Sequence, residues 1–139
     1  MAERALQLKD ETKAAGPLGV TINDSEDSVE VIVVIPGVKK PFLWLFGKNT
    51  TIDPDIFSER SIRLLVEIEK SNNRTELYLY KVKQLPEAIL PHSCSYCVEK
   101  NKIILTLVKA TPCSWKNSLD TYGLDISTPT SGTPPPQSS

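Results

Sequence analysis

Hydrophobic residues recur at every second position through the middle of the chain. Along residues 102–109 each alternate position from Ile103 to Leu107 is aliphatic, and the same period runs through residues 29–35 and 61–68. Because successive side chains of a strand point to opposite faces, this period predicts strands with one buried face. A lone pair of strands is marginal in water, so we expect these segments to pack together.

Turn-forming residues separate the predicted strands. Residues 70–74, Lys-Ser-Asn-Asn-Arg, are typical of a hairpin turn before a return strand at 75–82. Residues 85–91 hold two prolines, which lack the N–H that a central strand needs, so we expect a crossover loop before a strand at 93–100. This all-β pattern predicts an antiparallel β-sandwich of about seven strands.

Composition divides the chain into three parts. Residues 1–19 are polar and end in Gly-Pro-Leu-Gly, which predicts a flexible N-terminal arm with room for a short helix over 2–13. Residues 20–119 hold the strand pattern and form the predicted domain, with Trp115 expected to close one end of its core. Residues 120–139 become rich in Ser, Thr and Pro, so we expect a disordered tail.

Composition and charge exclude several classes of function. The 139 residues carry a formal net charge of −1 at pH 7 and no basic patch interleaved with aromatics, so nucleic-acid binding is not expected. The apolar runs are too short to cross a bilayer, and the N-terminus lacks a secretory pattern. Three cysteines, an odd number, fit a reducing compartment. The expected location is cytoplasmic, with the nucleus as a second compartment.

One set of side chains has the composition of a soft-metal site. His92, Cys94, Cys97 and Cys113 resemble four zinc ligands in type and spacing. In a strand, however, residues three apart point to opposite faces, so Cys94 and Cys97 converge only if the chain turns between them. A small buried cysteine is the alternative, and a nucleophilic cysteine beside His92 is a third. The sequence has no phosphate-binding loop and no hydrolase motif, so we expect neither an enzyme nor a cofactor.

Residues 41–47, Pro-Phe-Leu-Trp-Leu-Phe-Gly, have neither strand nor helix periodicity. We expect them either to fold into the core or to form an exposed patch that binds a partner. A membrane-surface segment is a third alternative, which the lack of a basic amphipathic face disfavours. Strand residues that face outward are the other candidates for partner contact. The candidate interaction residues are Phe42, Trp44, Phe46, Arg63, Leu65, Tyr78 and Tyr80, with Glu67 on the face of Arg63.

Two stretches give the sequence a family resemblance. Leu85-Pro-Glu-Ala-Ile-Leu-Pro91 and Cys94, followed by Lys102-Ile-Ile-Leu-Thr-Leu-Val-Lys-Ala110 and Trp115, resemble the second half of a CS domain. CS domains are co-chaperone sandwiches with the HSP20-like fold. A third stretch, Phe57-Ser-Glu-Arg-Ser-Ile-Arg-Leu-Leu-Val66, resembles the calcyclin-binding type within this family.

The resemblance implies a non-enzymatic adaptor. Domains of the calcyclin-binding type link ubiquitin-ligase components, a RING ligase and a Skp-type subunit, and so promote the degradation of targets. The alternative is a co-chaperone that docks onto the ninety-kilodalton heat-shock chaperone, as other CS domains do. Both imply protein partners, bound through sheet faces and exposed strand edges. We expect the chain itself to be a monomer.

Overall fold

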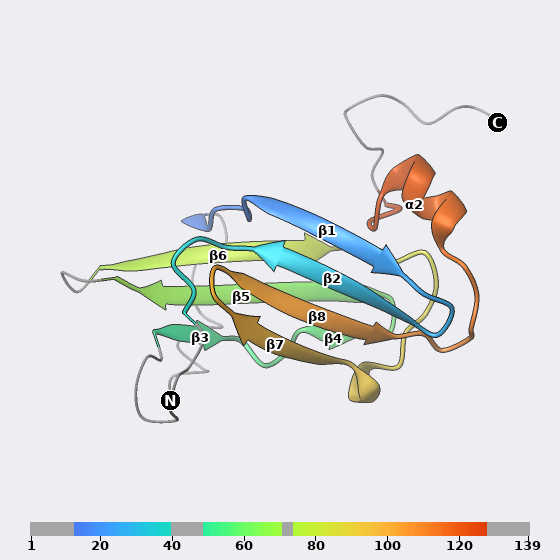
Figure 1. Ribbon diagram of the computed structural model, residues 1–139, viewed down its shortest axis with the longest axis horizontal. Helices are drawn as coiled ribbons and strands as arrows, with labels where there is room; N and C mark the ends of the chain where they lie inside the picture. Colours follow the sequence, from blue (N-terminus) through green and yellow to red (C-terminus); the bar gives the residue numbers. More distant parts are fainter. Residues whose placement is uncertain (1–12, 40–48, 71–73, 128–139) are drawn as a thin grey trace.

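The alternating segments form two antiparallel sheets that pack face to face (Figure 1). The computed structural model describes residues 13–39, 49–70 and 74–127. These residues form eight strands, a short 3-10 helix η3 (Pro91–Ser93) and an α-helix α2 (Lys116–Tyr122). The predicted all-β sandwich is therefore confirmed.

Sheet B consists of four strands, each antiparallel to its neighbour. Their order is β1 (Gly19–Asp24), β2 (Ser28–Val34), β8 (Lys102–Val108) and β7 (Ser95–Glu99). The strands β1 and β7 are therefore the two edges of this sheet. Residues 88–90 continue the β7 edge, because the Leu90 N–H donates to the carbonyl of Val108 at 2.8 Å.

Sheet A is built around β5 (Ser61–Glu69). Along one side of β5 lies β6 (Thr75–Val82), and the other side pairs with β3 (Thr50–Ile52) and β4 (Phe57–Ser58). The first described residues reach the free side of β6, where Ala15 forms a parallel bridge with Tyr78. The Ala15 N–H donates to the Leu77 carbonyl, and the Ala15 carbonyl accepts from the Leu79 N–H, both at 2.9 Å.

The core lies between the sheets and is built from the predicted alternate positions. The aliphatic residues that three central strands turn inward are at most 1% exposed: Val29, Val31 and Val33 of β2, Ile62, Leu64, Val66 and Ile68 of β5, and Ile103, Leu105 and Leu107 of β8. Burial of each such side chain stabilises the fold by about 1.5–3 kcal/mol before entropy is considered. Trp115 is 1% exposed, which confirms its predicted place in the core.

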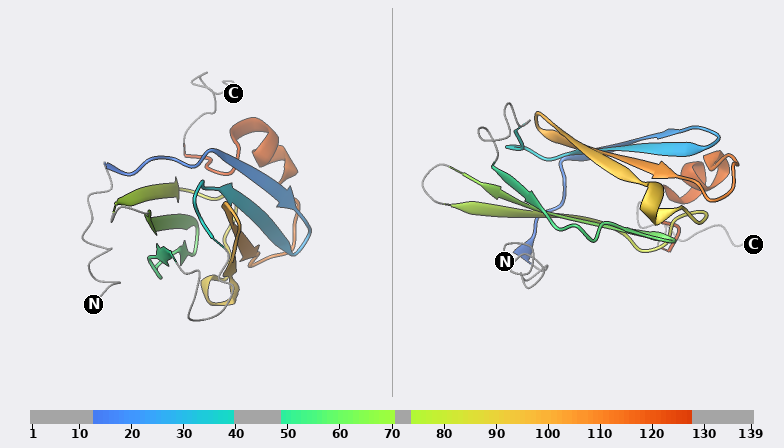
Figure 2. Two further views of the ribbon diagram at one scale, coloured as in Figure 1. Left: turned by 60° about the vertical axis from the view of Figure 1, so that its left-hand side comes forward. Right: turned by 90° about the horizontal axis from the view of Figure 1, so that it is seen from below.

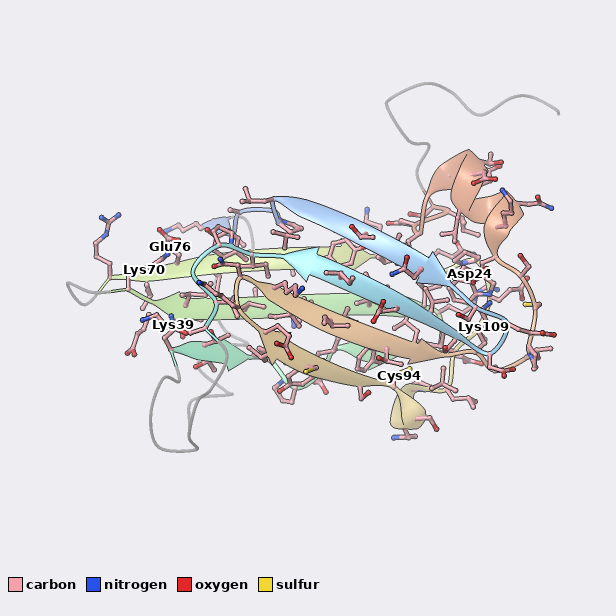
Figure 3. The ribbon with its side chains drawn as sticks, viewed as in Figure 1. Asp24, Lys39, Lys70, Glu76, Cys94 and Lys109 are labelled. Carbon is pink, nitrogen blue, oxygen red and sulfur yellow. The ribbon has the colours of Figure 1, made fainter. Side chains whose placement is uncertain are left out.

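One end of the sandwich is closed around a buried cation that the sequence analysis did not single out. Lys109 follows β8 on its inward parity, and its side chain is fully buried. Its ammonium donates to the Asp24 carboxylate at 2.7 Å (Figure 3). It also donates to the carbonyls of Ser25 and Cys113 and lies 5.2 Å from the centroid of the Trp115 ring. All three ammonium protons thus have an acceptor, as burial of the charge requires.

The opposite end is closed by turns and amide side chains. Gly37 has a φ of 92°, and its N–H donates to Oδ1 of Asn101 at 3.1 Å. The Asn49 amide donates to the Gly37 carbonyl at 3.0 Å, which ties the start of β3 to the turn after β2. Glycine is needed at position 37 for its φ, whereas the nearest atom to an added Cβ, Nζ of Lys70 at 2.5 Å, is the end of a flexible side chain that can move aside.

The strand predicted from residue 93 starts later than expected. Helix η3 occupies Pro91–Ser93, and β7 begins at Ser95. Pro91 fixes its own φ and has no N–H to donate, so the pairing of Leu90 with Val108 is followed by a helical turn before pairing with β8 resumes at Ser95.

The C-terminal part of the fold extends beyond the predicted boundary. The short turn expected after Trp115 is the seven-residue helix α2. Beyond it Leu124 is 4% exposed, and the Ile126 N–H donates to the Gln84 carbonyl at 2.8 Å. Packed structure therefore continues past residue 119, where the sequence predicts the domain to end.

Some predictions fall on residues that the structure does not describe. The apolar patch of Phe42, Trp44 and Phe46 lies outside the described residues, as do residues 1–12 and 128–139. Within the described ranges, no helix has the length and apolar character that crossing a bilayer demands.

Candidate interaction surface

The exposed large hydrophobic side chains of the described residues gather at the two edges of sheet B. Leu18 and Val20, at the β1 edge, are 73% and 36% exposed. Leu90 and Tyr96, at the β7 edge, are each 45% exposed. An edge strand also presents backbone N–H and C=O groups that its own sheet does not pair. The exposed apolar side chains on edge strands make both edges candidates for contact with another chain.

The β7 edge is held in place by a cysteine. The Cys94 thiol donates to the Leu90 carbonyl at 3.2 Å and accepts from the Val108 N–H at 3.4 Å. Burial raises the pKa of this thiol, against a smaller opposite effect of the Val108 hydrogen bond. A raised pKa keeps the thiol protonated, the reverse of what a nucleophile needs. Cys94 therefore serves the edge structurally, as the small-core-residue alternative expects.

The predicted zinc ligands do not form a cluster. Within the described residues, which include all four candidates, no group of three or more His, Cys, Asp and Glu side chains could hold a metal ion. The Cys97 thiol is exposed and lies 3.4 Å from a carboxylate oxygen of Glu99, while Cys94 faces the core. This is the separation expected of residues three apart near a strand. His92 is exposed in η3, so it is not placed to activate a buried thiol.

Arg63 and Leu65 lie on the outer face of sheet A, as predicted. Arg63 donates to the Asp53 carboxylate at 3.1 Å, and the Asp53 side chain is fully buried. Leu65 is 0% exposed although it is not part of the core cluster. Leu65 is therefore outward in direction but not available to a partner in this conformation.

The prediction that Tyr78 and Tyr80 face outward is wrong. Tyr78 is 9% exposed and belongs to the core cluster, and Tyr80 packs against that cluster. Burial, with a smaller contribution from the Asp125 charge, raises the pKa of Tyr80 to about 12. The outward residues of β6 are instead Leu77 and Leu79, because Leu79 stands opposite Leu65 in the register of β5 and β6.

Sequence reasoning missed the four edge residues. A strand becomes an edge only through the order in which distant segments pair, and alternation does not report that order. Tyr96 shares the inward parity of its strand, since it stands opposite the buried Leu105. It is exposed because sheet B ends beside it. The one local signal was Leu90, an apolar residue directly before Pro91.

A solved structure has a similar arrangement of strands. Heat shock protein 16.0 from Schizosaccharomyces pombe matches with a TM-score of 0.51 over 74% of this chain and 73% of that chain, at 16% sequence identity. The chain therefore has an HSP20-like fold. No protein-family model matches the sequence, and no curated protein matches it significantly.

The likeness reaches the fold and no further. The closer resemblance to CS domains of the calcyclin-binding type stays a prediction.

Proposed function

We propose that the chain is a non-enzymatic protein-interaction domain that binds extended, apolar segments of other proteins at the edges of sheet B. One observation carries the proposal. The exposed large hydrophobic residues of the described part, Leu18, Val20, Leu90 and Tyr96, lie at those two edges and not on the sheet faces.

The chemistry of an edge suits an extended chain. A segment that lies beside an edge strand can extend the sheet through backbone hydrogen bonds, which give affinity without regard to sequence. Leu90 and Tyr96 then add apolar contact, which favours segments with hydrophobic side chains. Unfolded or partly folded proteins expose such segments, so the binding mode fits a small chaperone-like domain.

Two finer roles rest on the resemblance of the sequence. In the first, the domain links a RING ubiquitin ligase to a Skp-type subunit; the stretch from Phe57 to Val66 supports this role. In the second, it docks onto the ninety-kilodalton heat-shock chaperone. Both require protein partners and no catalytic group, and both leave the edges of sheet B as the contact surface.

Aggregation of a reduced model client, followed by light scattering, tests the proposal. We expect the purified chain to slow aggregation, and the double variant Leu90→Lys/Tyr96→Lys to lose most of that effect, because charge at an edge opposes pairing. Ser58→Lys/Thr75→Lys is the matched control, since it adds the same two charges at exposed strand positions of the other sheet. If Leu90→Lys/Tyr96→Lys is as effective as this control, the edge proposal is refuted.

The finer roles need purified partners. Titration of the chain with a RING ligase and a Skp-type subunit is expected to give a ternary complex if the adaptor role holds. Titration with the ninety-kilodalton chaperone, with its ATPase rate as the second readout, examines the co-chaperone role. If neither partner binds while client aggregation is still suppressed, the general interaction role stands without either finer one.

A further inference from the structure

Sheet A ends in a hollow of about 560 Å³, lined by β4, the start of β5 and the end of β6. Five polar side chains of this lining define what is here called the basic hollow: Ser58, Ser61, Arg63, Lys81 and Lys83. The sequence analysis singled out Arg63 alone among them. Only the pairing of the strands brings the other four beside it.

The basic hollow lies on the outer face of sheet A. Ile62 and Val82 stand opposite each other and are each 1% exposed, so both face the core. Successive residues of a strand alternate between the faces, so three neighbours of this pair face outward: Ser61, Arg63 and Lys81. Figure 2 (right) shows this outer face as the lower side of the molecule, with α2 above it beside sheet B. The basic hollow is therefore separate from both edges of sheet B.

The basic hollow concentrates positive charge. Arg63 stands directly opposite Lys81 in the register of β5 and β6, and like charges in that position destabilise a sheet. Lys83 adds a third cation to the lining, whereas Asp55 is its one acidic residue. The whole chain, by contrast, has a formal net charge of −1. An anion bound between the two strands would relieve the repulsion of the opposed cations.

Arg63 is held in place by a buried partner. Its Nη1 donates to Oδ2 of Asp53 at 3.1 Å, and the Asp53 side chain is fully buried. The other carboxylate oxygen of Asp53 accepts from the Asp55 N–H at 2.9 Å. The Arg63 side chain remains 27% exposed, so this fixed guanidinium reaches the surface. With Asp53 counted as well as Asp55, the positive charges around the hollow still exceed the negative ones by one.

Hydroxyl groups and an anchored lysine complete the lining. Ser58 stands directly opposite Ser61 where β4 pairs with β5, and each hydroxyl can donate a hydrogen bond to an anion. The Lys83 N–H donates to Oδ2 of Asp125 at 3.0 Å, which fixes the backbone from which its ammonium extends. Guanidinium, ammonium and hydroxyl donors around one hollow are the groups that bind phosphate oxygens in proteins.

We propose that the basic hollow binds a phosphate monoester carried by a protein segment, as phosphoserine or phosphothreonine. Such a group has a charge of about −1.5 to −2 at pH 7 and three acceptor oxygens, which suits several donors better than a carboxylate does. Phe57, the aromatic residue among the described lining, packs against the core cluster and leaves no ring face on which a nucleotide base could stack. Lys81 and Lys83 are exposed, so a segment of another protein can reach them.

A titration followed by NMR tests the proposal. The probe is a flexible peptide of glycines around one phosphoserine, added to the isotope-labelled full chain. We expect saturable shifts of the amide signals of Ser61, Arg63 and Lys81, while the signal of the buried Leu105 stays in place. The same peptide without the phosphate is expected to cause no shifts. Added salt should weaken binding, because the site is partly exposed.

Two double variants separate a built site from general attraction by charge. Lys81→Gln/Lys83→Gln removes two exposed cations of the hollow and is expected to weaken binding about tenfold or more, since charge-assisted hydrogen bonds are strong. Lys39→Gln/Lys100→Gln removes two exposed cations elsewhere and is the matched control, with an expected change of less than about twofold. Equal weakening in both variants would contradict the proposal.

Three further ligands test the identity of the bound group. If inorganic phosphate binds as tightly as the phosphopeptide, the peptide contributes nothing and a protein segment is the wrong source. If adenosine monophosphate binds more tightly than the phosphopeptide, the ligand is a nucleotide and the proposal is wrong. If a peptide with glutamate in place of phosphoserine binds equally well, the site does not select phosphate.

This inference does not depend on client binding at sheet B. The variant Leu90→Lys/Tyr96→Lys changes only the β7 edge of that sheet, so we expect it to bind the phosphopeptide as the wild type does. Failure of the phosphopeptide titration would leave the edge proposal intact, and failure of the aggregation assay would leave the basic hollow intact.

Discussion

The two sheets of this sandwich differ in how far their outward side chains and edge strands are exposed. On sheet B the outward Ile32 and Ile104 are partly exposed, and both edge strands carry exposed apolar side chains. On sheet A the outward Leu65 is 0% exposed, and Ala15 pairs with the free side of β6. Two sheets of similar size and one shared core thus have an open and a closed exterior. On this basis we propose that apolar segments of partners bind sheet B, with sheet A as its support.

The largest expected effect concerns the buried Lys109 ammonium, which closes one end of the sandwich. Lys109→Ala leaves two carbonyls without their donor and the partly buried Asp24 carboxylate with only the Trp115 N–H, and we expect a loss of about 3–5 kcal/mol in the free energy of unfolding. Urea denaturation followed by Trp115 fluorescence measures it. Lys116→Ala, which removes the exposed pair with Asp120, is expected to leave the urea midpoint unchanged. Equal urea midpoints for the two variants would show that the interactions of Lys109 do not stabilise the fold.

The second effect compares equivalent positions on the two outer faces. Leu65→Ala is expected to cost about 2–5 kcal/mol, as for a core leucine, because the removed methyl groups are fully buried. Ile104→Ala on sheet B is expected to cost about 1–2 kcal/mol, since less apolar area leaves water there. Thermal and urea unfolding of both variants measure the contrast. Equal losses would mean that both faces are equally covered, and the comparison of an open with a closed sheet would fail.

The third effect uses the inward tyrosine of sheet A. The folded state raises the pKa of Tyr80 from 10.0 to about 12, so folding favours its neutral form. The resulting stability is fully present below pH 10 and is lost as the pH rises through 12. At about 1.4 kcal/mol per pKa unit, the loss is about 2–3 kcal/mol. Urea midpoints from pH 9 to 12 are expected to fall less steeply for Tyr80→Phe than for the wild type. If the urea midpoints of Tyr80→Phe and the wild type fall in parallel with pH, Tyr80 is exposed to solvent.

The sequence was sufficient to predict the inward faces of the central strands β2, β5 and β8. Strands β2, β5 and β8 alternate so strongly that one parity had to be buried, and the alternate residues Ile103, Leu105 and Leu107 are buried as predicted. The same parity carries Lys109 inward, so the buried cation could have been found as a charge on an apolar face. A lysine there needs an acidic partner, and Asp24 stands at the end of β1.

The outer half could not be predicted, for two physical reasons. On β6 both parities are apolar, with Leu77 and Leu79 on one and Tyr78, Tyr80 and Val82 on the other. Alternation then does not show which residues of β6 face the core, and only the pairing of β6 with β5 decides this. Edges are decided by pairing between strands distant in sequence, so Tyr96 has the parity of a core residue and the exposure of a surface residue.

The smallest expected effect on stability separates the two edges of sheet B. Tyr96→Lys and Val20→Lys change exposed side chains, so each is expected to alter the free energy of unfolding by less than about 0.5 kcal/mol. Their effects on client binding should differ. Tyrosine is enriched among residues that dominate binding energy and valine is under-represented, so Tyr96→Lys is expected to weaken client affinity about tenfold or more. For Val20→Lys we expect less than about threefold, measured by fluorescence anisotropy of a labelled unfolded peptide. The reverse order would make β1 the principal edge, while equal losses would mean that a client bridges both.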